Sequence, residues 1–299
     1  MFSIIITTYK RPVKVLMKAI NSVLSQSYTD WELIIVNDFH EDNNLVKDIR
    51  NLIENYKDNR IKYKVHDKNK GACEARNTGI NNSNGEFIAF LDDDDEWCNE
   101  KLESVLPYFK DEKIGMVCSD AFFIYDTYEK IHKIRPINKH KKNAFKALLI
   151  NNYIGSTSFP VMTRKAVIEA GGFSPDMRAC QDLDLWLRIA RKFEIEYCPL
   201  PLTKYYFGDE CITKNIKARI ESHEKLIKKY IQEYNNEPNL LSLKYLNIAA
   251  DCLLTDDINY FKLYFNKART LKHTEITNYI VIIKAFINVA RNNIKRIAQ

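Results

Sequence analysis

The first 120 residues alternate short apolar runs with segments of helical periodicity, and this alternation constrains the fold more than any other feature of the chain. Buried strands are predicted at the apolar runs, which lie at residues 3–7, 31–37, 61–66, 86–91 and 116–125. Amphipathic helices are predicted between them, at residues 13–26, 44–56 and 71–81. Strands and helices in this order indicate an α/β domain built on a parallel sheet.

The rest of the chain falls into two stretches of different character. Residues 135–207 contain glycines, prolines and little periodicity, so we expect loops around short elements and one helix at 182–192. Beyond residue 216 glycine disappears, and helices are expected at residues 240–254, 258–271 and 277–297. The sequence therefore predicts two domains, an α/β domain over residues 1–213 and an α-helical region over residues 214–299.

Positive charge is concentrated in the last third of the chain. Residues 211–299 contain 15 Lys and Arg against 8 Asp and Glu, while the whole chain has a net charge of +6. This surplus suits an anionic membrane or a polyanionic acceptor, although a solvated helical face would carry it equally well. The first 210 residues are close to neutral, which argues against a nucleic-acid partner.

Cysteine usage and hydropathy bear on location. The seven cysteines form no C-x-x-C pair, which fits a reducing cytoplasm better than a disulfide framework and disfavours a structural zinc site. The chain begins directly with a strand, so no signal peptide is expected. A membrane span needs about 18 uncharged apolar residues in a row, and none is predicted. We therefore expect a cytoplasmic protein.

Four consecutive aspartates, Asp92 to Asp95, follow the apolar run at 86–91. Their mutual repulsion would raise their pKa values unless a cation neutralised them. Carboxylate oxygens are hard ligands that suit Mg²⁺ or Mn²⁺, and either ion can bridge phosphates. Ligands of open α/β sheets bind beyond the carboxyl ends of the strands, so the position fits a metal site. A solvated acidic turn or an Asp-rich helix start is the alternative.

Polar residues also follow the first two predicted strands. Thr7, Thr8 and Tyr9 end the first strand, and Asn37 and Asp38 end the second. Side chains at neighbouring carboxyl ends could grip a nucleoside, with Asp38 accepting a hydrogen bond from a base N–H or a ribose hydroxyl. Loops are polar in any case, so each of these residues alone is a weak signal.

The run from Gly71 to Gly79 combines glycine, a predicted helix start and Arg76. Glycine lets the backbone approach a ligand, and a helix start favours anions. Arg76 could therefore face a diphosphate or hold one of the aspartates, or it could be an ordinary surface arginine. No G-x-G-x-x-G follows the first strand, which argues against a dehydrogenase.

Asp182 and Asp184 stand at the start of the helix predicted at 182–192. A carboxylate there could act as a general base if it reached an acceptor hydroxyl. Residues two apart point to different faces of a helix, so only one of the pair can serve. Asp182 also suits a helix cap, which is the more ordinary interpretation.

Together these segments resemble the family 2 inverting glycosyltransferases of the GT-A fold. The likeness covers roughly residues 2–207 and runs through ordered motifs at residues 6–12, 22–28, 31–38, 71–79, 90–95, 171–173 and 181–182. It implies a GT-A domain, with the Rossmann-like mixed sheet of nucleotide-diphospho-sugar transferases, followed by an α-helical C-terminal region. It also implies transfer of a hexose or N-acetylhexosamine, most often from a UDP-sugar, with inversion at the anomeric carbon.

The resemblance implies a role for each matching residue. Asp182 would be the catalytic base, and Asp94 and Asp92 would hold Mn²⁺ or Mg²⁺. The ion would act as a Lewis acid on the departing diphosphate. A nucleotide-binding set is implied as well, comprising Thr7, Tyr9, Asp38, Arg76, Asp92 and Asp93.

Some positions depart from the family pattern. Asn37 stands where an aspartate is common, and Phe39-His40 replaces the usual Gly-Ser. The basic residue that often closes the diphosphate site near the end of the family's catalytic domain is missing, and Lys204 or Lys214 could take its place.

The resemblance also suggests partners, namely a UDP-sugar donor and a glycan or lipid-linked glycan acceptor in polysaccharide, lipopolysaccharide or capsule synthesis. The apolar stretch at 279–287 precedes Arg291, Lys295 and Arg296, and such a helix could lie on the inner face of the plasma membrane. It could equally pack on the catalytic domain or on a second copy in a homo-oligomer.

Two other functions stay open from the residues alone. A nucleotidyltransferase of related fold would also use paired aspartates with Mg²⁺, but residues 7–12 lack the glycine-rich loop expected of it. A non-catalytic binding module for an anionic polymer would use the basic C-terminal region without any chemistry.

Overall fold

The computed structural model describes residues 1–39, 41–134, 143–207, 215–271 and 279–297. The chain divides into two compact units. Unit 1 comprises Met1–Ala144, Tyr153–Met177 and Gln181–Asp209, and unit 2 comprises Phe145–Asn152, Arg178–Cys180 and Glu210–Gln299. The domain limits predicted from the sequence, 1–213 and 214–299, remain a prediction.

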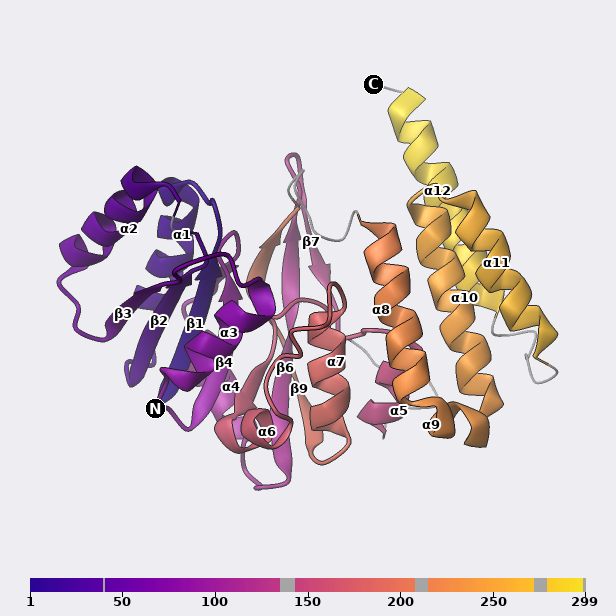
Figure 1. Cartoon of the computed structure of the whole chain (residues 1–299), viewed down its shortest axis with the longest axis horizontal. Coiled ribbons are helices and arrows are strands. Elements are labelled where there is room, and N and C mark those ends of the chain that lie inside the picture. Colours follow the sequence, from indigo (N-terminus) through magenta and orange to yellow (C-terminus); the bar gives the residue numbers. More distant parts are fainter. Residues whose placement is uncertain (40, 135–142, 208–214, 272–278, 298–299) are drawn as a thin grey trace. The chain divides into compact units, whose positions relative to one another are not determined.

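Unit 1 is built on a nine-stranded mixed sheet with the strand order β3-β2-β1-β4-β8-β6-β9-β5, in which β7 pairs with β6 (Figure 1). The strands are β1 Phe2–Thr8, β2 Trp31–Asn37, β3 Ile61–Val65, β4 Phe87–Asp92, β5 Glu96–Trp97, β6 Ile114–Ile124, β7 Glu129–His132, β8 Val161–Thr163 and β9 Glu194–Tyr206. The helices of this unit are α1 Val13–Leu24, α2 Asn43–Tyr56, α3 Ala72–Asn81, α4 Lys101–Val105, α6 Arg164–Glu169 and α7 Gln181–Ala190, with a 3-10 turn η1 at Leu106–Tyr108.

Strand direction places several strand ends along one edge of this sheet. Strands β3, β2, β1 and β4 are parallel, and β8 runs antiparallel to both β4 and β6. Strands β6 and β9 are parallel to each other. Because β8 opposes both of its neighbours, β4 and β6 run the same way. The carboxyl ends of β1, β2, β4, β6 and β9 therefore point to a common edge, where such sheets bind ligands.

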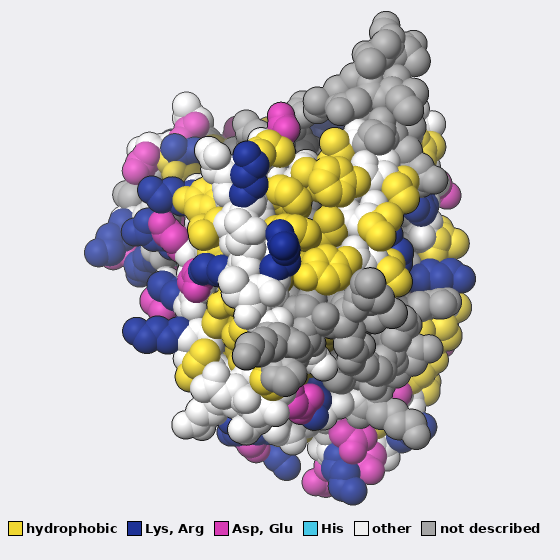
Figure 2. Space-filling view, turned by 90° about the vertical axis from the view of Figure 1, so that its right-hand side faces the viewer, with side chains coloured by type: hydrophobic (Ala, Val, Ile, Leu, Met, Phe, Trp, Pro, Cys, Tyr) yellow, Lys and Arg dark blue, Asp and Glu magenta, His cyan; other side chains and the backbone are white. Residues whose placement is uncertain are grey.

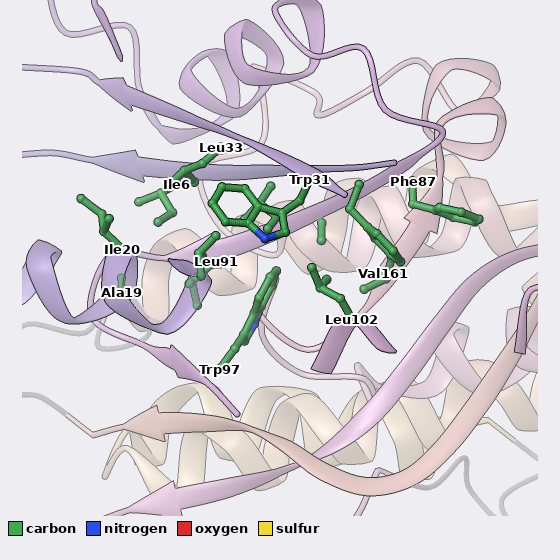
Figure 3. Packing of buried hydrophobic residues seen from close by; sticks show 14 of the residues in the cluster. Ile6, Ala19, Ile20, Trp31, Leu33, Phe87, Leu91, Trp97, Leu102 and Val161 are labelled. Carbon is green, nitrogen blue, oxygen red and sulfur yellow. The ribbon is translucent and has the colours of Figure 1, made fainter. Parts of the chain in front are cut away.

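The core of unit 1 lies between the central strands and α1 (Figure 3). Alternate residues of each strand point to this side, as the two-residue period of a strand requires. Each is almost fully excluded from solvent, and together they include Ile4, Ile6, Leu33, Ala89 and Leu91 from the strands with Leu16, Ala19, Ile20 and Val23 from α1. The intervening residues Ile5, Ile34 and Ile88 are equally buried on the other face. Burial on both faces explains why the parallel strands are continuous apolar runs.

Helix α3 packs directly on β1 through Gly79. A Cβ atom at this position would collide with the side chain of Ile5. The helix can therefore approach the strand closely only because the residue is glycine. This contact fixes the height of α3, which carries Arg76, above the sheet.

Unit 2 is helical. Its helices are α5 Ala144–Ile150, α8 Ile216–Lys229, α9 Ile231–Asn236, α10 Pro238–Leu254, α11 Ile258–Thr270 and α12 Ile280–Ile297. Helix α10 is the buried centre, since both α11 and α12 pack against it. The short segment at 178–180 joins this unit through a hydrogen bond from the Ala179 N–H to Ser222 Oγ (3.1 Å). No helix within the described part of the chain combines the length and apolarity needed to cross a membrane.

The predicted elements of the first 120 residues are confirmed, with boundaries shifted by a few residues at most. The predicted helices at 240–254, 258–271 and 277–297 correspond to α10, α11 and α12. Strands β5, β7, β8 and β9 were not predicted. The longest of them, β9, contains Pro199 and Pro201 and pairs with β6 through register shifts, so it has no regular apolar alternation.

Candidate functional site

The strand register brings the predicted polar residues together at the carboxyl edge of the sheet. Thr7 lies beside Asp92 in the β1–β4 pair, and Thr8 lies beside Asn37 in the β1–β2 pair. Tyr9 is exposed at the end of β1, and its ring packs edge-on against Phe39 with centroids 5.5 Å apart. The arrangement is a row of polar and aromatic side chains along three adjacent strand ends, as the sequence predicted.

Asp92 is held by side chains from outside its own strand. Its Oδ1 accepts hydrogen bonds from Arg76 Nη2 (3.1 Å) and Thr157 Oγ1 (2.9 Å). Its Oδ2 accepts a hydrogen bond from Ser156 Oγ (3.1 Å), while its main-chain N–H donates to Ser158 Oγ (3.0 Å). The Asp92 side chain nevertheless keeps 29% of its surface exposed. The carboxylate is therefore fixed in orientation and still open to a ligand.

Arg11 binds the next two aspartates. Its Nε lies 2.9 Å from Asp93 Oδ1, and its Nη2 lies 3.0 Å from Asp94 Oδ2. Burial raises the pKa of Asp93 to about 6 despite this contact. Burial, with repulsion from Asp92, also raises the pKa of Asp94. Burial therefore disfavours the ionised forms of both carboxylates, and repulsion between the aspartates adds to the effect.

Asp95 points inward and connects the aspartate loop to β9. Its side chain is buried, and its Oδ1 accepts a hydrogen bond from the main-chain N–H of Tyr206 (3.4 Å). Burial, with repulsion from Asp92, raises the pKa of Asp95 well above that of a free carboxyl group. The end of β9 is thus attached to the loop that carries Asp92 to Asp94.

A buried lysine supports the same region from inside the unit. Lys101 Nζ donates hydrogen bonds to the Phe159 carbonyl (2.7 Å), Ser119 Oγ (3.2 Å) and Thr203 Oγ1 (3.2 Å). Burial lowers the pKa of the Lys101 ammonium to about 7. Because Phe159 follows directly on Ser158, Lys101 anchors the loop whose hydroxyl groups hold Asp92.

Arg76 joins the aspartates to the start of α7. Its Nη1 donates to Gln181 Oε1 (3.0 Å), its Nη2 donates to Asp92, and its guanidinium lies 5.2 Å from the centre of the Phe173 ring. Gln181 immediately precedes Asp182. The structure therefore brings the helix that carries the predicted base next to the predicted metal-binding and nucleotide-binding residues.

The two carboxylates of α7 have different surroundings. Asp184 is buried, and its Oδ2 accepts hydrogen bonds from Ser174 Oγ (2.7 Å) and from Arg188 Nη2 (2.6 Å). Asp182 is partly exposed at the helix start, where its Oδ1 accepts a hydrogen bond from the Leu183 N–H (2.8 Å). Asp184 is thus committed to an ion pair inside the unit, and Asp182 is the better placed of the two to meet a ligand.

Asp38 is buried and holds the loop that leads into α3. Its Oδ1 accepts from the Lys70 N–H (2.8 Å), and its Oδ2 accepts from the Gly71 N–H (2.8 Å). Its Oδ1 also lies 2.7 Å from His66 Nδ1, and His66 Nε2 lies 2.9 Å from Thr78 Oγ1 in α3. Asp38 therefore fixes the shape of this loop, and its predicted contact with a nucleoside stays a prediction.

The arrangement of the carboxylates can be compared with what a divalent-ion site, as predicted from the sequence, requires. Within the described residues, no group of three or more His, Cys, Asp or Glu side chains is arranged to hold a metal. Mg²⁺-type sites commonly use only one or two carboxylates and complete the coordination with waters and substrate phosphates. Asp92 and Asp94 fit this pattern, because both are partly exposed and Asp94 is destabilised by the charge of Asp92. A cation at this corner would relieve that repulsion.

Several residues of the site were not assigned a role from the sequence. The sequence assigns Arg11 no role beyond its place in the motif at residues 6–12, and Ser156, Thr157 and Ser158 lie in a region without periodicity. A run of three hydroxyl residues in a loop was the one available signal. Lys204 lies opposite Glu96 in the β9–β5 pair, whereas His40 and Lys214 lie outside the described residues.

Comparison with sequences of known proteins identifies the family. The model of glycosyl transferase family 2 matches residues 3–171. An Escherichia coli relative, UDP-Glc:alpha-D-GlcNAc-diphosphoundecaprenol beta-1,3-glucosyltransferase WfgD, is 32% identical over 202 residues, which are 66% of this chain and 74% of that protein. A Rickettsia conorii glycosyltransferase is 31% identical over 200 residues, but the chain covers only 30% of its length. A Haemophilus influenzae glycosyltransferase is 27% identical over 304 residues and matches 97% of this chain.

Comparison with solved structures identifies the fold. Mannosyltransferase PcManGT from Pyrobaculum calidifontis, in complex with GDP-Man and Mn²⁺, aligns with a TM-score of 0.64 at 15% identity over 97% of this chain and 80% of its own. S. aureus TarS 1–349 in complex with UDP aligns with a TM-score of 0.57 at 15% identity over 96% of this chain and 91% of its own. Both are GT-A-like transferases, which confirms the predicted fold class. The chain belongs to glycosyl transferase family 2, as the resemblance of its sequence motifs predicted.

Proposed function

We propose that the protein is an inverting, metal-dependent glycosyltransferase that transfers a sugar from a UDP-sugar to a hydroxyl group of a glycan acceptor. The observation that carries the proposal is the pair of hydrogen bonds from Arg76 to Asp92 and Gln181. They bring a carboxylate corner suited to a diphosphate-bound ion next to the helix start that carries Asp182. Donor activation and acceptor deprotonation thus have candidate residues within one site.

In this proposal Asp92 and Asp94 hold Mn²⁺ or Mg²⁺. When bound, the ion supplies Lewis-acid stabilisation of the departing diphosphate. Arg76 and Arg11 are the protein's own cations beside the aspartates, and they are suited to bind phosphate oxygens because a guanidinium can bind two of them at once. Thr7, Tyr9, Asp38 and Asp93 form the proposed nucleotide-binding wall.

Asp182 is the proposed general base. It would take the proton from the acceptor hydroxyl as that oxygen attacks the anomeric carbon from the side opposite the leaving diphosphate. A positioned base of this kind contributes a factor of about 10²–10⁴. One displacement of this type inverts the anomeric configuration.

The nature of donor and acceptor is proposed from the relatives. WfgD uses, by its name, UDP-Glc and an acceptor linked to diphosphoundecaprenol. The structural neighbours bind UDP, UDP-GlcNAc or GDP-Man, so the fold alone does not choose the donor base. We propose UDP because the sequence motifs resemble those of UDP-sugar enzymes, and a lipid-linked glycan of surface-polysaccharide synthesis as the acceptor.

A lipid-linked acceptor would require contact with a membrane, and unit 2 has a surface suited to it. Helix α12 buries Ile282 and Ala285 but exposes Ile283, Phe286 and Ile287, so it is apolar on two faces. Figure 2 shows apolar side chains gathered on this side of unit 2, with Lys or Arg side chains among them. An apolar face with basic residues suits the interface of an anionic bilayer. We propose peripheral attachment at the cytoplasmic face of the plasma membrane.

Calorimetry and donor hydrolysis test the proposal without knowledge of the acceptor. UDP should bind with micromolar affinity in the presence of Mn²⁺ and much more weakly with EDTA, and at least one UDP-sugar should be hydrolysed slowly. Absence of heat with UDP and Mn²⁺ at millimolar ligand, together with hydrolysis of GDP-Man instead, would reject the UDP assignment. Family membership favours this proposal over a nucleotidyltransferase or a binding module for an anionic polymer.

A further inference from the structure

Aromatic rings gather at the ends of β6 and β9, in a part of unit 1 to which the proposed donor site assigns no role. The cluster consists of Phe123, Tyr125, Tyr128, His132, Tyr205 and Phe207. Tyr125 and Tyr128 flank the two-residue turn between β6 and β7, and the Tyr125 N–H donates to the Tyr128 carbonyl (2.9 Å). The cluster therefore stands on a tight hairpin and a strand end, which are rigid supports.

Three of the rings form a parallel stack. The centroids of Tyr125 and Tyr128 are 4.5 Å apart with an interplanar angle of 18°, and those of Tyr125 and Phe207 are 4.6 Å apart with an angle of 4°. The two outer rings are half-exposed, Tyr128 at 50% and Phe207 at 46%. Large apolar rings held together and open to water commonly mark binding surfaces.

Neighbouring rings outside the stack pack against it and hold it in place. Phe123 packs edge-on against Phe207 (5.0 Å, 75°), and Tyr205 does the same (5.1 Å, 79°). Phe123 in turn stacks on His132 (4.3 Å, 5°). A platform fixed in this way loses little side-chain entropy when a ligand settles on it.

The ring cluster is connected to the aspartate loop through Tyr206. Tyr206, between Tyr205 and Phe207, donates from its main-chain N–H to Asp95 and from its hydroxyl to Glu96 (2.7 Å). Successive residues of a strand point to opposite faces, so Tyr206 faces the aspartate loop while its two neighbours face the ring cluster. Strands β6 and β4 run the same way, so the platform and Asp92 lie at the same edge of the sheet.

We infer that the stack of Tyr128, Tyr125 and Phe207, here called the aromatic platform, is a subsite for a pyranose ring of the acceptor glycan. A pyranose has one face of polarised C–H groups, which the negative face of an aromatic ring attracts, and a rim of hydroxyls that remains in water. The donor nucleotide is proposed to lie along β1, β2 and β4. The half of the sheet with the platform is therefore left for the acceptor. This inference rests on the proposed function and adds a specificity element to it.

Saturation-transfer NMR on the full chain tests the platform directly. The probes are the methyl glycosides of glucose, galactose, N-acetylglucosamine and N-acetylgalactosamine at millimolar concentration. We expect at least one glycoside to receive saturation from the wild type and to lose at least four-fifths of it in the double variant Tyr128→Ala/Phe207→Ala. The single variant Tyr128→Phe, in which Phe207 is unchanged, should keep the wild-type signal, because both aromatic rings are kept.

A matched control separates binding from folding. Ile131→Ala removes another half-exposed apolar side chain, 47% exposed, from the same hairpin, and it should leave the signal unchanged. Equal signals from the wild type and the double variant would overturn the inference, and so would absence of saturation for all four glycosides. Vesicle binding that depends on the two rings, without glycoside saturation, would also overturn it in favour of a lipid contact.

The outcome can be told apart from failure of the proposed function. UDP binding with Mn²⁺ is measured on the same samples, and the double variant should bind UDP within about twofold of the wild type. If the wild type binds a glycoside but not UDP, the donor assignment fails and the platform stands. If it binds UDP but no glycoside, the platform fails and the donor site stands.

Discussion

At the scale of single residues, two arginines bind three of the four consecutive aspartates. Arg76 binds Asp92, and Arg11 binds Asp93 and Asp94. Arg11 therefore occupies one of the two carboxylates proposed to hold the divalent ion. In the proposed metal site, the ion would compete with the Arg11 guanidinium for Asp94.

Removal of Arg11 should strengthen metal binding in the absence of nucleotide. We expect Arg11→Ala to lower the dissociation constant for Mn²⁺ by about tenfold, the equivalent of about 1.4 kcal/mol. Electron paramagnetic resonance of free Mn²⁺ during a titration gives this constant. Lys10→Ala is the control, because Lys10 lies over the Tyr9 and Phe39 rings and should leave the affinity unchanged. Weaker Mn²⁺ binding in Arg11→Ala would contradict the competition.

The two carboxylates of α7 should respond to substitution in different ways. Asp182→Asn should lower turnover by about 10²–10⁴ and leave UDP affinity and thermal stability near wild type. Asp184→Asn breaks a buried ion pair with Arg188, which costs about 3–5 kcal/mol, and should lower the melting temperature. Rates of product formation test the first expectation, and melting curves followed by circular dichroism test the second. Normal turnover in Asp182→Asn would place the base elsewhere.

Lys101 should give the protein a distinctive pH dependence of stability. Its folded pKa of about 7 lies below the usual ~10.4, so above pH ~7 the unfolded chain holds a proton that the folded chain has released. Stability then rises with pH between about 7 and 10, by at most about 1.4 kcal/mol per pH unit, and the penalty of burial is fully present below pH 7. Lys101→Met should flatten this rise in urea midpoints measured from about pH 6.5 to 8.

Lys244 provides the control for this measurement. It is also buried, and burial lowers its pKa to about 8, so its contribution begins at higher pH. Lys244→Met should keep most of the rise below pH 8. An unchanged slope in Lys101→Met would show that the lysine remains protonated inside the fold.

At the scale of elements, the strands and helices that the sequence predicts correctly are those in which buried residues recur with a regular period. Strands β1, β2 and β4 are buried on both faces and α1 on one, so their residues repeat with clear periods. Strand β9 was not predicted, because its two prolines and its register shifts interrupt the alternation. Short strands such as β5 and β8 have too few residues to show any period.

The candidate site divides in the same way. Residues at strand ends, such as Thr7 and Asp92, could be grouped from the sequence because parallel strands end at one edge. The contacts of Arg11 with Asp93 and of Thr157 with Asp92 join residues more than sixty positions apart. Such contacts depend on how loops fold back over the sheet, which no local pattern encodes.

The packing of α3 on β1 should be sensitive to a single methyl group. Gly79→Ala would normally favour a helix by about 1 kcal/mol. Here the new Cβ meets Ile5, so we expect net destabilisation of about 1–3 kcal/mol and weaker UDP binding as Arg76 shifts. Asn81→Ala, at an exposed position of the same helix, should leave both unchanged. A stabilised Gly79→Ala variant would mean that the helix can move away without cost.

At the scale of the whole molecule, the C-terminal helices combine the excess of basic charge with a group of exposed apolar residues. Phe261 of α11 and Phe286 of α12 pack edge to face at 5.8 Å, so the two helices contribute to one apolar surface. Ile258, Leu263, Ile280 and Ile283 are each more than 40% exposed on these helices. A helix that is apolar on both faces is normally covered by a partner or by lipid.

Cosedimentation with vesicles should reveal that partner. We expect binding to phosphatidylglycerol vesicles at low salt, weaker binding at high salt, and at least tenfold weaker binding of Ile283→Glu/Ile287→Glu. Leu200→Glu, at a position 46% exposed in unit 1, should bind like the wild type. The alternative result is a protein that fails to bind vesicles and forms a dimer that the double variant disrupts. That result would show that a second copy of the chain packs on the apolar surface.

The hydrogen bonds of Asp38 have a consequence for how donor preference can evolve. Asp38 is bonded to the amides of Lys70 and Gly71, and through His66 it is linked to Thr78 on the helix that carries Arg76. In the proposed site, a lineage that replaced Asp38 to accommodate another base would also disturb Arg76, the arginine proposed to bind the diphosphate. Exchange of one nucleotide donor for another should therefore require paired substitutions along this chain, and single-step intermediates would be selected against.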